Sequence, residues 1–106
     1  MNEDKGHDVK YEIDGQLFVW NSIKYNENKI KHKITFEEAA TVFMADDTEY
    51  FDDEEHSYDE DRFIAIGISH CNNLLMVCHC TRESGTVTRI ISARKAEKYE
   101  QKQLRW

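Results

Sequence analysis

Three apolar runs between Arg62 and Ala96 constrain the fold more than any other part of this chain. Residues 62–69 and 74–82 form the first two runs, and the third begins at Arg89, just beyond Ser84-Gly85. Apolar runs of this length that are bounded by turn residues are typical of β-strands. The segment therefore predicts an antiparallel meander.

The register of these strands decides which side chains reach the core. A two-residue turn at Asn72-Asn73 would place residue 66 opposite residue 79, and the second turn would place residue 80 opposite residue 89. The face expected to lie under helices then carries Ile64, Ile66, Ile68, Leu75, Val77, His79 and Ile90. The opposite face is expected to be open, and it carries Phe63, Ala65, Gly67, Ser69, Met76, Cys78, Cys80, Arg82, Arg89 and Ile91. A slip of one residue would exchange the two faces.

Two shorter strand signals precede the meander. Val9–Ile13 and Leu17–Trp20 flank Asp14-Gly15, a dipeptide typical of tight hairpin turns. We expect a hairpin whose second arm enters the main sheet. Thr48–Phe51 is predicted to form a short strand at an edge of that sheet.

A helix is expected from about Ser22 to His32. Asn21 or Ser22 suits its N-cap, because either side-chain oxygen can accept the free amide hydrogens of the first turn. The buried face of this helix is expected to carry Ile23, Asn26 or Glu27, and Ile30.

Two more helices complete the prediction. Thr35 can cap the second helix with Glu38 at the capping-box position. The apolar face of that helix is expected to consist of Phe36, Ala39, Ala40, Val42 and Phe43. The run from Arg89 begins as a strand and is expected to turn into a last helix, from Lys95 to about Leu104. The chain thus predicts an α+β fold: a small antiparallel sheet, two N-terminal helices and one C-terminal helix, with the helices mainly on one face.

The length of 106 residues suits a single domain with one core. We expect residues 9–106 to form this domain and residues 1–8 to be a disordered polar extension. No run of 18 apolar residues is present, so no membrane span is expected, and the polar N-terminus lacks the apolar centre of a signal peptide. A cytoplasmic protein is therefore predicted. Its three cysteines are expected to be reduced thiols.

Charge is distributed unevenly along the chain. The net charge is -7, and ten acidic residues with no lysine or arginine lie between Asp46 and Asp61. From Arg62 to the end, eight cations stand against three acids. A negative total would argue against a nucleic-acid partner, but the distribution of charge matters more than its sum.

Several motifs in a fixed order extend through these elements. They are Phe18-Val19-Trp20, Asn28 with Lys31-His32, Thr35-Phe36-Glu37-Glu38-Ala39 with Val42-Phe43, Arg62-Phe63-Ile64-Ala65-Ile66-Gly67, His79-Cys80-Thr81-Arg82-Glu83, and Arg89 through Ala96 with Glu100. With these motifs the sequence resembles the BrnT family of type II toxin–antitoxin toxins over residues 16–104. It departs from the family pattern at Asn21, where an aspartate is usual, at Lys33, where a glycine is usual, and in its dense acidic segment.

The resemblance implies a RelE-like fold and a metal-independent ribonuclease that cuts RNA and stops translation. It also implies a ribbon-helix-helix antitoxin, BrnA, that holds the toxin inactive in a hetero-oligomer. No cofactor is expected.

Cutting RNA without a metal requires removal of the 2′-hydroxyl proton, stabilisation of a pentavalent phosphorane, and protonation of the 5′-oxygen. Arg82 and Arg89, neighbours on the predicted open face, are the first candidates for the phosphorane, because a guanidinium grips two phosphate oxygens. Arg62 could join them, and His32 is the candidate general acid or base. Taken without the resemblance, the two strand arginines fit slightly better as solvated side chains that pair with nearby acids.

Four further cations are candidates for RNA binding: Lys29, Lys31, Arg94 and Lys95. The first two lie just before His32 in the sequence. The last two lie at the expected start of the last helix, where free amides could help to hold an anion. The alternative for Arg94 and Lys95 is ordinary surface solvation. For His32 it is a hydrogen bond to the end of its own helix.

A zinc site and a purely protein-binding role were weighed against this interpretation. His70, Cys71, Cys78, His79 and Cys80 are of ligand types that zinc prefers, but strand alternation sends His79 away from the two neighbouring thiols. The acidic segment lacks the glycine and ligand spacing of a calcium loop. We therefore expect no metal. The net charge and the acidic segment leave open a non-catalytic domain that binds only a partner protein.

Overall fold

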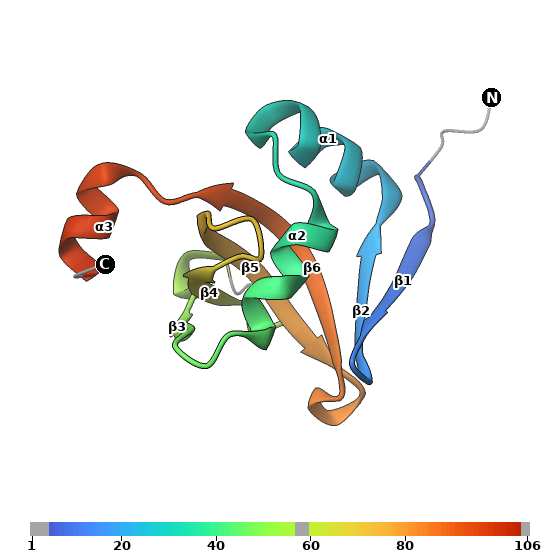
Figure 1. Cartoon of the computed structure of the whole chain (residues 1–106). Helices are drawn as coiled ribbons and strands as arrows, with labels where there is room; N and C mark the ends of the chain where they lie inside the picture. Colours follow the sequence, from blue (N-terminus) through green and yellow to red (C-terminus); the bar gives the residue numbers. More distant parts are fainter. Residues whose placement is uncertain (1–4, 57–59, 105–106) are drawn as a thin grey trace.

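The computed structural model describes residues 5–56 and 60–104, which form one six-stranded sheet in the order β1-β2-β6-β5-β4-β3 (Figure 1). The strands are β1 (Asp8–Ile13), β2 (Gln16–Asn21), β3 (Glu49–Asp52), β4 (Phe63–Ile68), β5 (Leu74–Arg82) and β6 (Val87–Lys95). The helices described are α1 (Ser22–His32), α2 (Phe36–Thr41) and α3 (Lys98–Leu104), with short 3-10 helices at Val42–Met44, Glu54–His56 and Glu83–Gly85. The α+β class is confirmed. None of the described helices has the length and apolar character needed to cross a membrane.

The sheet is mixed, so the prediction of a wholly antiparallel sheet is wrong. β1 and β2 form the predicted hairpin, and its turn residues Asp14 and Gly15 both have positive φ, as a tight hairpin turn requires. β2 then enters the main sheet beside β6, as predicted, but the two strands run parallel. A parallel neighbour is possible because the long segment between them returns the chain to the same end of the sheet.

The register of β4 against β5 differs from the prediction by three residues. Phe63, rather than Ile66, lies opposite His79, whereas β5 pairs with β6 as predicted at Cys80 and Arg89. The turn is longer than two residues, because the Ser69 amide donates to the Asn73 carbonyl. An odd shift moves every β4 side chain to the other face. Ile64, Ile66 and Ile68 therefore lie on the face opposite to the one predicted, where Ile66 is nevertheless buried, and Phe63, Ala65 and Gly67 lie on the core face.

Hydrogen bonds from α2 explain this register. The Glu38 carboxylate accepts from the Ser69 hydroxyl at 2.6 Å and from the Asn73 side-chain amide at 2.8 Å. The Ser69 oxygen in turn accepts the amide of Cys71 at 3.2 Å. The turn is thus held by a residue more than 30 positions earlier, which turn propensity alone does not reveal.

α2 covers the core face of the sheet. Thr35 caps it as predicted, accepting the Glu38 amide at 3.1 Å. The fully buried cluster consists of Phe18, Trp20, Ile34, Phe36, Ala39, Ala40, Val42, Ala65, Leu75, Val77, Ile90 and Ala93. The Trp20 ring contacts both Tyr25 of α1 and Phe36 of α2, so aromatic contacts join both helices to β2.

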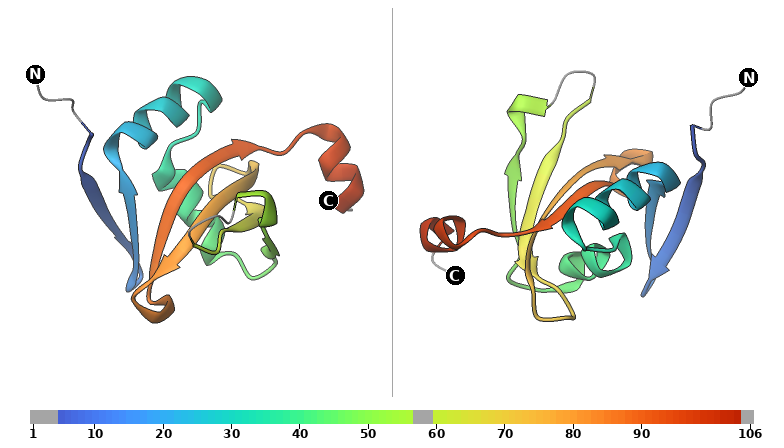
Figure 2. Two further views of the ribbon diagram at one scale, coloured as in Figure 1. Left: turned by 180° about the vertical axis from the view of Figure 1, so that it is seen from behind. Right: turned by 90° about the horizontal axis from the view of Figure 1, so that it is seen from above.

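α1 lies where β2 and β6 diverge, and both its bounds and its Asn21 cap agree with the prediction (Figures 1 and 2). Its buried face does not agree, because Ile30 is 73% exposed and Asn28 is buried. The Asn28 side chain accepts the Ala93 amide at 3.0 Å and donates to the Ala93 carbonyl at 2.8 Å. β2 pairs with β6 only as far as Arg89, so the backbone of Ala93 has no strand partner on that side. The Asn28 side chain supplies the missing hydrogen bonds.

The last strand is longer than predicted, and the last helix starts later. β6 continues to Lys95, which lies opposite Leu75, and the Ala96 amide still donates to the Leu74 carbonyl. α3 begins at Lys98 and lies beyond the end of β6 rather than over the sheet (Figure 1). Arg94 and Lys95 are therefore strand residues, and the prediction that they start a helix is wrong.

The expected disordered extension covers residues 1–8. Residues 1–4 lie outside the described residues, whereas Lys5–His7 lie against the start of α1 and Asp8 begins β1. The predicted edge strand is present as β3, one residue later than expected.

Candidate functional site

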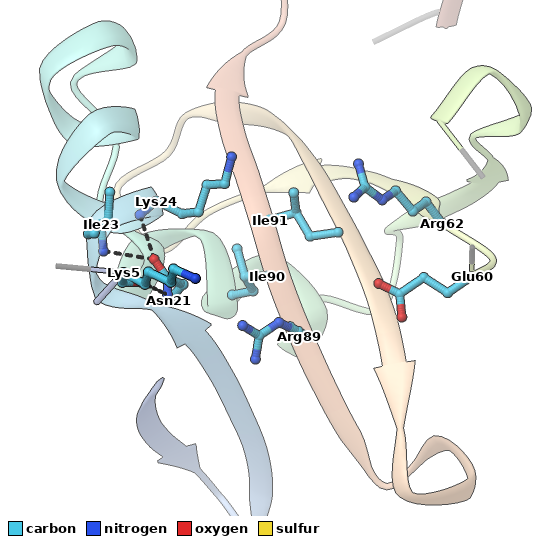
Figure 3. A pocket seen from close by; sticks show the side chains of 9 residues that line it. All are labelled: Lys5, Asn21, Ile23, Lys24, Glu60, Arg62, Arg89, Ile90 and Ile91. Atoms are coloured by element: carbon cyan, nitrogen blue, oxygen red, sulfur yellow. Dashed lines mark hydrogen bonds between the residues drawn. The ribbon is translucent and has the colours of Figure 1, made fainter. Parts of the chain in front are cut away.

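The open face of the sheet is hollowed along β6 by two adjoining pockets. The first, of about 380 Å³, is named here the Arg89 pocket and is lined by Lys5, Asn21, Ile23, Lys24, Glu60, Arg62, Arg89, Ile90 and Ile91 (Figure 3). The second, of about 310 Å³, is named the His32 pocket and is lined by Lys31, His32, Ile64, Met76, Cys78, Ser92, Ala93 and Arg94. Consecutive residues of β6, Ile91 and Ser92, line the two pockets, so the pockets follow one another along the strand.

The Arg89 pocket is strongly cationic in a chain of net charge -7. Its lining includes the cations Lys5, Lys24, Arg62 and Arg89, with Glu60 as its carboxylate. These side chains come from three separate regions: the start of α1 with the segment before β1, the middle of β6, and the segment entering β4 (Figure 3). A concave surface with this charge focuses a field that attracts anions.

Arg89 is held at the pocket by the carboxylate of Asp8. One of its guanidinium nitrogens donates to Asp8 Oδ1 at 3.1 Å, and the side chain of Asp8 is 56% exposed. This hydrogen bond lowers the pKa of Asp8, which is therefore ionised at neutral pH. Ion pairs that are this exposed contribute little stability, so an incoming anion can replace Asp8.

Arg82 lies further along β5 and lines neither pocket. Its guanidinium donates twice to the Glu60 carboxylate and once to the Cys80 thiol. The bond to Glu60 raises the pKa of Arg82, and the bond from Arg82 lowers the pKa of Glu60. Arg82 therefore positions Glu60, and only Glu60 reaches the pocket.

His32 belongs to the second pocket, together with Lys31 and Arg94. Burial lowers the pKa of His32, and the positive charges of Lys31 and Arg94 lower it further. The imidazole is therefore neutral at pH 7 and can accept a proton. Among the described side chains of the two pockets, it is the only imidazole.

Arg94 is fixed by two hydrogen bonds of 2.8 Å to Glu100 of α3. These bonds lower the pKa of Glu100 to about 2. Glu100 also accepts the amide of Glu97 at 2.7 Å. Arg94 therefore anchors the start of α3, although part of its side chain lines the His32 pocket.

Two of the predicted RNA-binding lysines lie away from both pockets. Lys29 lines a surface with Ile30 and Lys33 on the outer side of α1, and its ammonium lies 6.0 Å from the centre of the Tyr25 ring. Lys95 lies near the β4–β5 turn, beside Asn73. The structure brings Arg62 with Arg89 into one pocket, and His32 with Lys31 and Arg94 into the next.

His79 and the cysteines occupy separate environments. His79 is buried on the core face among the rings of Phe43, Tyr50 and Phe63, and burial lowers its pKa. Burial raises the pKa of the Cys78 thiol on the open face to about 11. Within residues 5–56 and 60–104, no three or more His, Cys, Asp or Glu side chains are grouped so that they could hold a metal ion.

Four residues at or beside the Arg89 pocket were not predicted as site residues: Lys5, Asp8, Lys24 and Glu60. The first two belong to the segment expected to be disordered, and Glu60 belongs to the acidic segment. The one sequence signal for Lys24 is its position in the first turn of α1, on the same side as Lys31 one helical heptad later. Folding, rather than any local motif, brings these residues to Arg89.

Comparison with known proteins adds one finding. Residues 20–100 match a protein family described as "Ribonuclease toxin, BrnT, of type II toxin-antitoxin system". No curated protein matches the chain. The matched region contains the α1, β4, β5 and β6 residues that line the two pockets, whereas Lys5 and Asp8 lie before it.

Proposed function

The chain belongs to the BrnT family of ribonuclease toxins of type II toxin–antitoxin systems, and on this basis we propose that it cleaves RNA along the two pockets beside β6. The family implies an RNA substrate and an antitoxin partner. Cleavage proceeds without a metal ion and inhibits translation in the cytoplasm. A ribbon-helix-helix antitoxin of the BrnA type neutralises the protein in a hetero-oligomer.

The observation that carries the proposal is the clustering of cations on one face of an acidic protein. Lys24, Arg62 and Arg89 line one pocket, and Lys31 and Arg94 line the next. Contacts to phosphates dominate the affinity of proteins for nucleic acids, and grooves with this charge track the backbone of a single strand. Lys24 and His32 are eight residues apart on α1, which is about 12 Å along the helix axis. The two pockets together therefore suit a run of nucleotides.

We place the scissile phosphate over Ile91 and Ser92, between the two pockets. Arg62 and Arg89 reach it from one side and stabilise the charge that develops on the phosphorane oxygens. His32 approaches from the other side, and its neutral imidazole removes the 2′-hydroxyl proton. Lys31, which lines the same pocket, can donate a proton to the departing 5′-oxygen.

Glu60 is the second group that could accept the 2′-hydroxyl proton. Its hydrogen bonds from Arg82 lower its pKa below the ordinary value of 4.5, which makes it a weak base. Efficient general bases have a pKa close to the working pH, and His32 satisfies this condition better. We therefore assign Glu60 the positioning of the cations around it.

The three ion pairs of Arg82, Arg89 and Arg94 favour a second candidate function. A domain in which these three arginines are engaged by its own carboxylates could bind a partner protein without cutting RNA. The two functions differ in whether the protein cuts RNA when it is expressed without a partner.

Expression of the chain alone in a bacterial host tests the proposal, with growth and total messenger RNA followed over time. We expect growth arrest and fragmented RNA, both abolished by the double change Arg82→Ala/Arg89→Ala with the protein still folded. The purified protein should retain cleavage in excess EDTA. Normal growth and intact RNA, with folded protein present in quantity, would contradict RNA cleavage and favour the protein-binding function.

A further inference from the structure

We infer that the segment Lys5–Asp8 is part of the RNA-binding site, and that the Lys5 ammonium binds a phosphate next to the one held by Arg89. The inference rests on the proposed function. It adds a subsite from a part of the chain that precedes the region matched by the family.

The segment is fixed to the start of α1 by four backbone and side-chain contacts. The Ser22 amide donates to the His7 carbonyl at 2.8 Å, and the His7 amide donates to the Ser22 hydroxyl at 3.0 Å. The Asn21 side-chain amide donates to the Lys5 carbonyl at 3.1 Å, while the oxygen of the same side chain caps α1. The His7 ring nitrogen Nδ1 lies 3.4 Å from the Ser22 hydroxyl. Reciprocal bonds of this kind specify one position for the segment.

Gly6 makes this close approach possible. Its φ of +77° lies in the left-handed region, which glycine adopts at no steric cost. A Cβ at this position would lie 2.8 Å from Ser22 Oγ, 3.0 Å from Ile23 Cγ1 and 3.1 Å from Asn21 Nδ2. No other residue would let the segment lie this close to the helix, so docking is a specific property of the sequence.

Docking delivers a cation to the Arg89 pocket. Lys5 lines that pocket with Lys24 and Arg89, and Figure 3 shows its side chain beside Asn21 at the rim. Asp8 follows three residues later and holds Arg89. The same short segment therefore supplies one ammonium to the pocket, and its Asp8 holds the central guanidinium in an exposed ion pair that a phosphate can replace.

The chemistry of Lys5 fits a phosphate that is bound but not cleaved. A lysine acts as a compact point charge, which binds phosphate without the planar grip that arginine gives a reacting group. Its place is at the rim beside Asn21, whereas Arg62 points toward Ile91 from the other side of β6 (Figure 3). The occupant we assign to this subsite is thus a backbone phosphate of single-stranded RNA flanking the scissile one.

Salt dependence of RNA binding tests the subsite. The probe is a short single-stranded RNA with 2′-O-methyl groups, which cannot be cleaved because it lacks the attacking hydroxyl. Lys5→Ala should weaken binding roughly 3- to 10-fold at low salt, and should reduce the slope of log K against log salt by about 0.7, the value for one lost phosphate contact with a single strand. Lys98→Ala, which removes the same charge from an exposed position on α3, should leave the slope unchanged.

Two glycine variants separate docking from general strain. Gly6→Ala should reproduce the weaker binding and the smaller slope of Lys5→Ala, because the added Cβ displaces the segment. Gly15→Ala meets nothing within 4 Å and shares only the positive φ, +85°. It should strain the β1–β2 turn by a similar amount and bind the probe as the wild type does.

The outcomes are distinguishable. If the wild type binds the probe and Lys5→Ala binds it with the wild-type slope, the subsite is refuted and the proposed function stands. If the wild type does not bind the probe or cut RNA under any salt condition, the proposed function fails and the subsite fails with it. In cleavage assays, Lys5→Ala should raise KM and leave kcat within about twofold, since uniform binding affects only KM.

Discussion

Arg89 and Arg94 lie on the same strand, five residues apart, and their carboxylate partners hold them differently. Arg89 makes one hydrogen bond of 3.1 Å to Asp8, whose side chain is 56% exposed. Arg94 makes two hydrogen bonds of 2.8 Å to Glu100, whose side chain is 12% exposed. The first pair lies at the edge of the Arg89 pocket, and the second joins β6 to α3.

This difference teaches which arginine is available to a ligand. A two-pronged arginine–carboxylate pair has strong, directional bonds, whereas an exposed single pair is worth at most about 1 kcal/mol. A phosphate can offer Arg89 more than Asp8 does, but it cannot easily improve on Glu100. We therefore treat Arg89 as a binding residue and Arg94 as chiefly an anchor for α3, although both are cations of the open face.

The largest expected effect on RNA cleavage is the loss of Arg89, compared with the loss of Arg94. Arg89→Ala should lower kcat/KM for RNA cleavage at least about 100-fold, because it removes a donor to the developing charge of the phosphorane. Arg94→Ala should lower it by less than about 10-fold. Steady-state cleavage of a fluorescent oligoribonucleotide measures both, with thermal unfolding as the control for folding. Equal losses of kcat/KM in the two variants would contradict the assignment of Arg89 to RNA binding and Arg94 to the anchoring of α3.

The sequence predicted the local elements of this site better than their assembly. The hairpin at Asp14-Gly15, the Asn21 cap of α1 and the Thr35 cap of α2 were found because each depends on residues within one turn. The β4–β5 register was missed because it depends on the hydrogen bond that the Ser69 hydroxyl donates to the distant Glu38 carboxylate. The start of α3 was missed because pairing with β5 keeps β6 extended to Lys95.

Long-range contacts also limited how well the candidate site could be predicted. Arg82 and Arg89 were predicted to lie together, with Arg62 as a possible third member, but the pocket contains Arg62 and Arg89 and not Arg82. Lys5 and Glu60 were not predicted, because each reaches the pocket through contacts with a distant segment, to α1 for Lys5 and to Arg82 for Glu60. Asn28 was not among the residues expected on the buried face of α1, yet it is buried because β6 needs a hydrogen-bonding partner there.

His32 tests whether the second pocket takes part in the chemistry. Burial lowers its pKa below the ordinary value of 6.5, so the neutral form that acts as a base dominates at pH 7. We expect kcat/KM to rise with pH through a value below 6.5 and then to level off. His32→Ala should remove this rise and lower kcat about 100-fold. A rate that instead falls across the same range would assign His32 the role of acid.

The anchor at the other end of β6 should appear as acid-sensitive stability. The folded-state pKa of Glu100 is about 2, below its ordinary value of 4.5, so its contribution is present above pH 4.5 and is lost as the pH falls toward 2. Glu100→Gln should reduce the free energy of unfolding by roughly 1 kcal/mol at pH 7, after allowance for the partial exposure of Arg94. Chemical denaturation from pH 7 to pH 2 measures the difference, which should shrink across that interval. A difference that is constant with pH would mean that the ion pair does not anchor α3.

The smallest predicted effect concerns the exchangeable partner of Arg89. Asp8→Asn should strengthen binding of the 2′-O-methyl RNA probe by about two- to threefold at low salt, because phosphate no longer competes with a carboxylate for the guanidinium. Glu12→Gln is the matched control, since it removes the same charge from another exposed position of β1. Any general gain from a less negative protein appears in both variants, so only the excess in Asp8→Asn reports the contact with Arg89. If Asp8→Asn binds RNA more weakly than Glu12→Gln, Asp8 orients Arg89 for the substrate instead of competing with it.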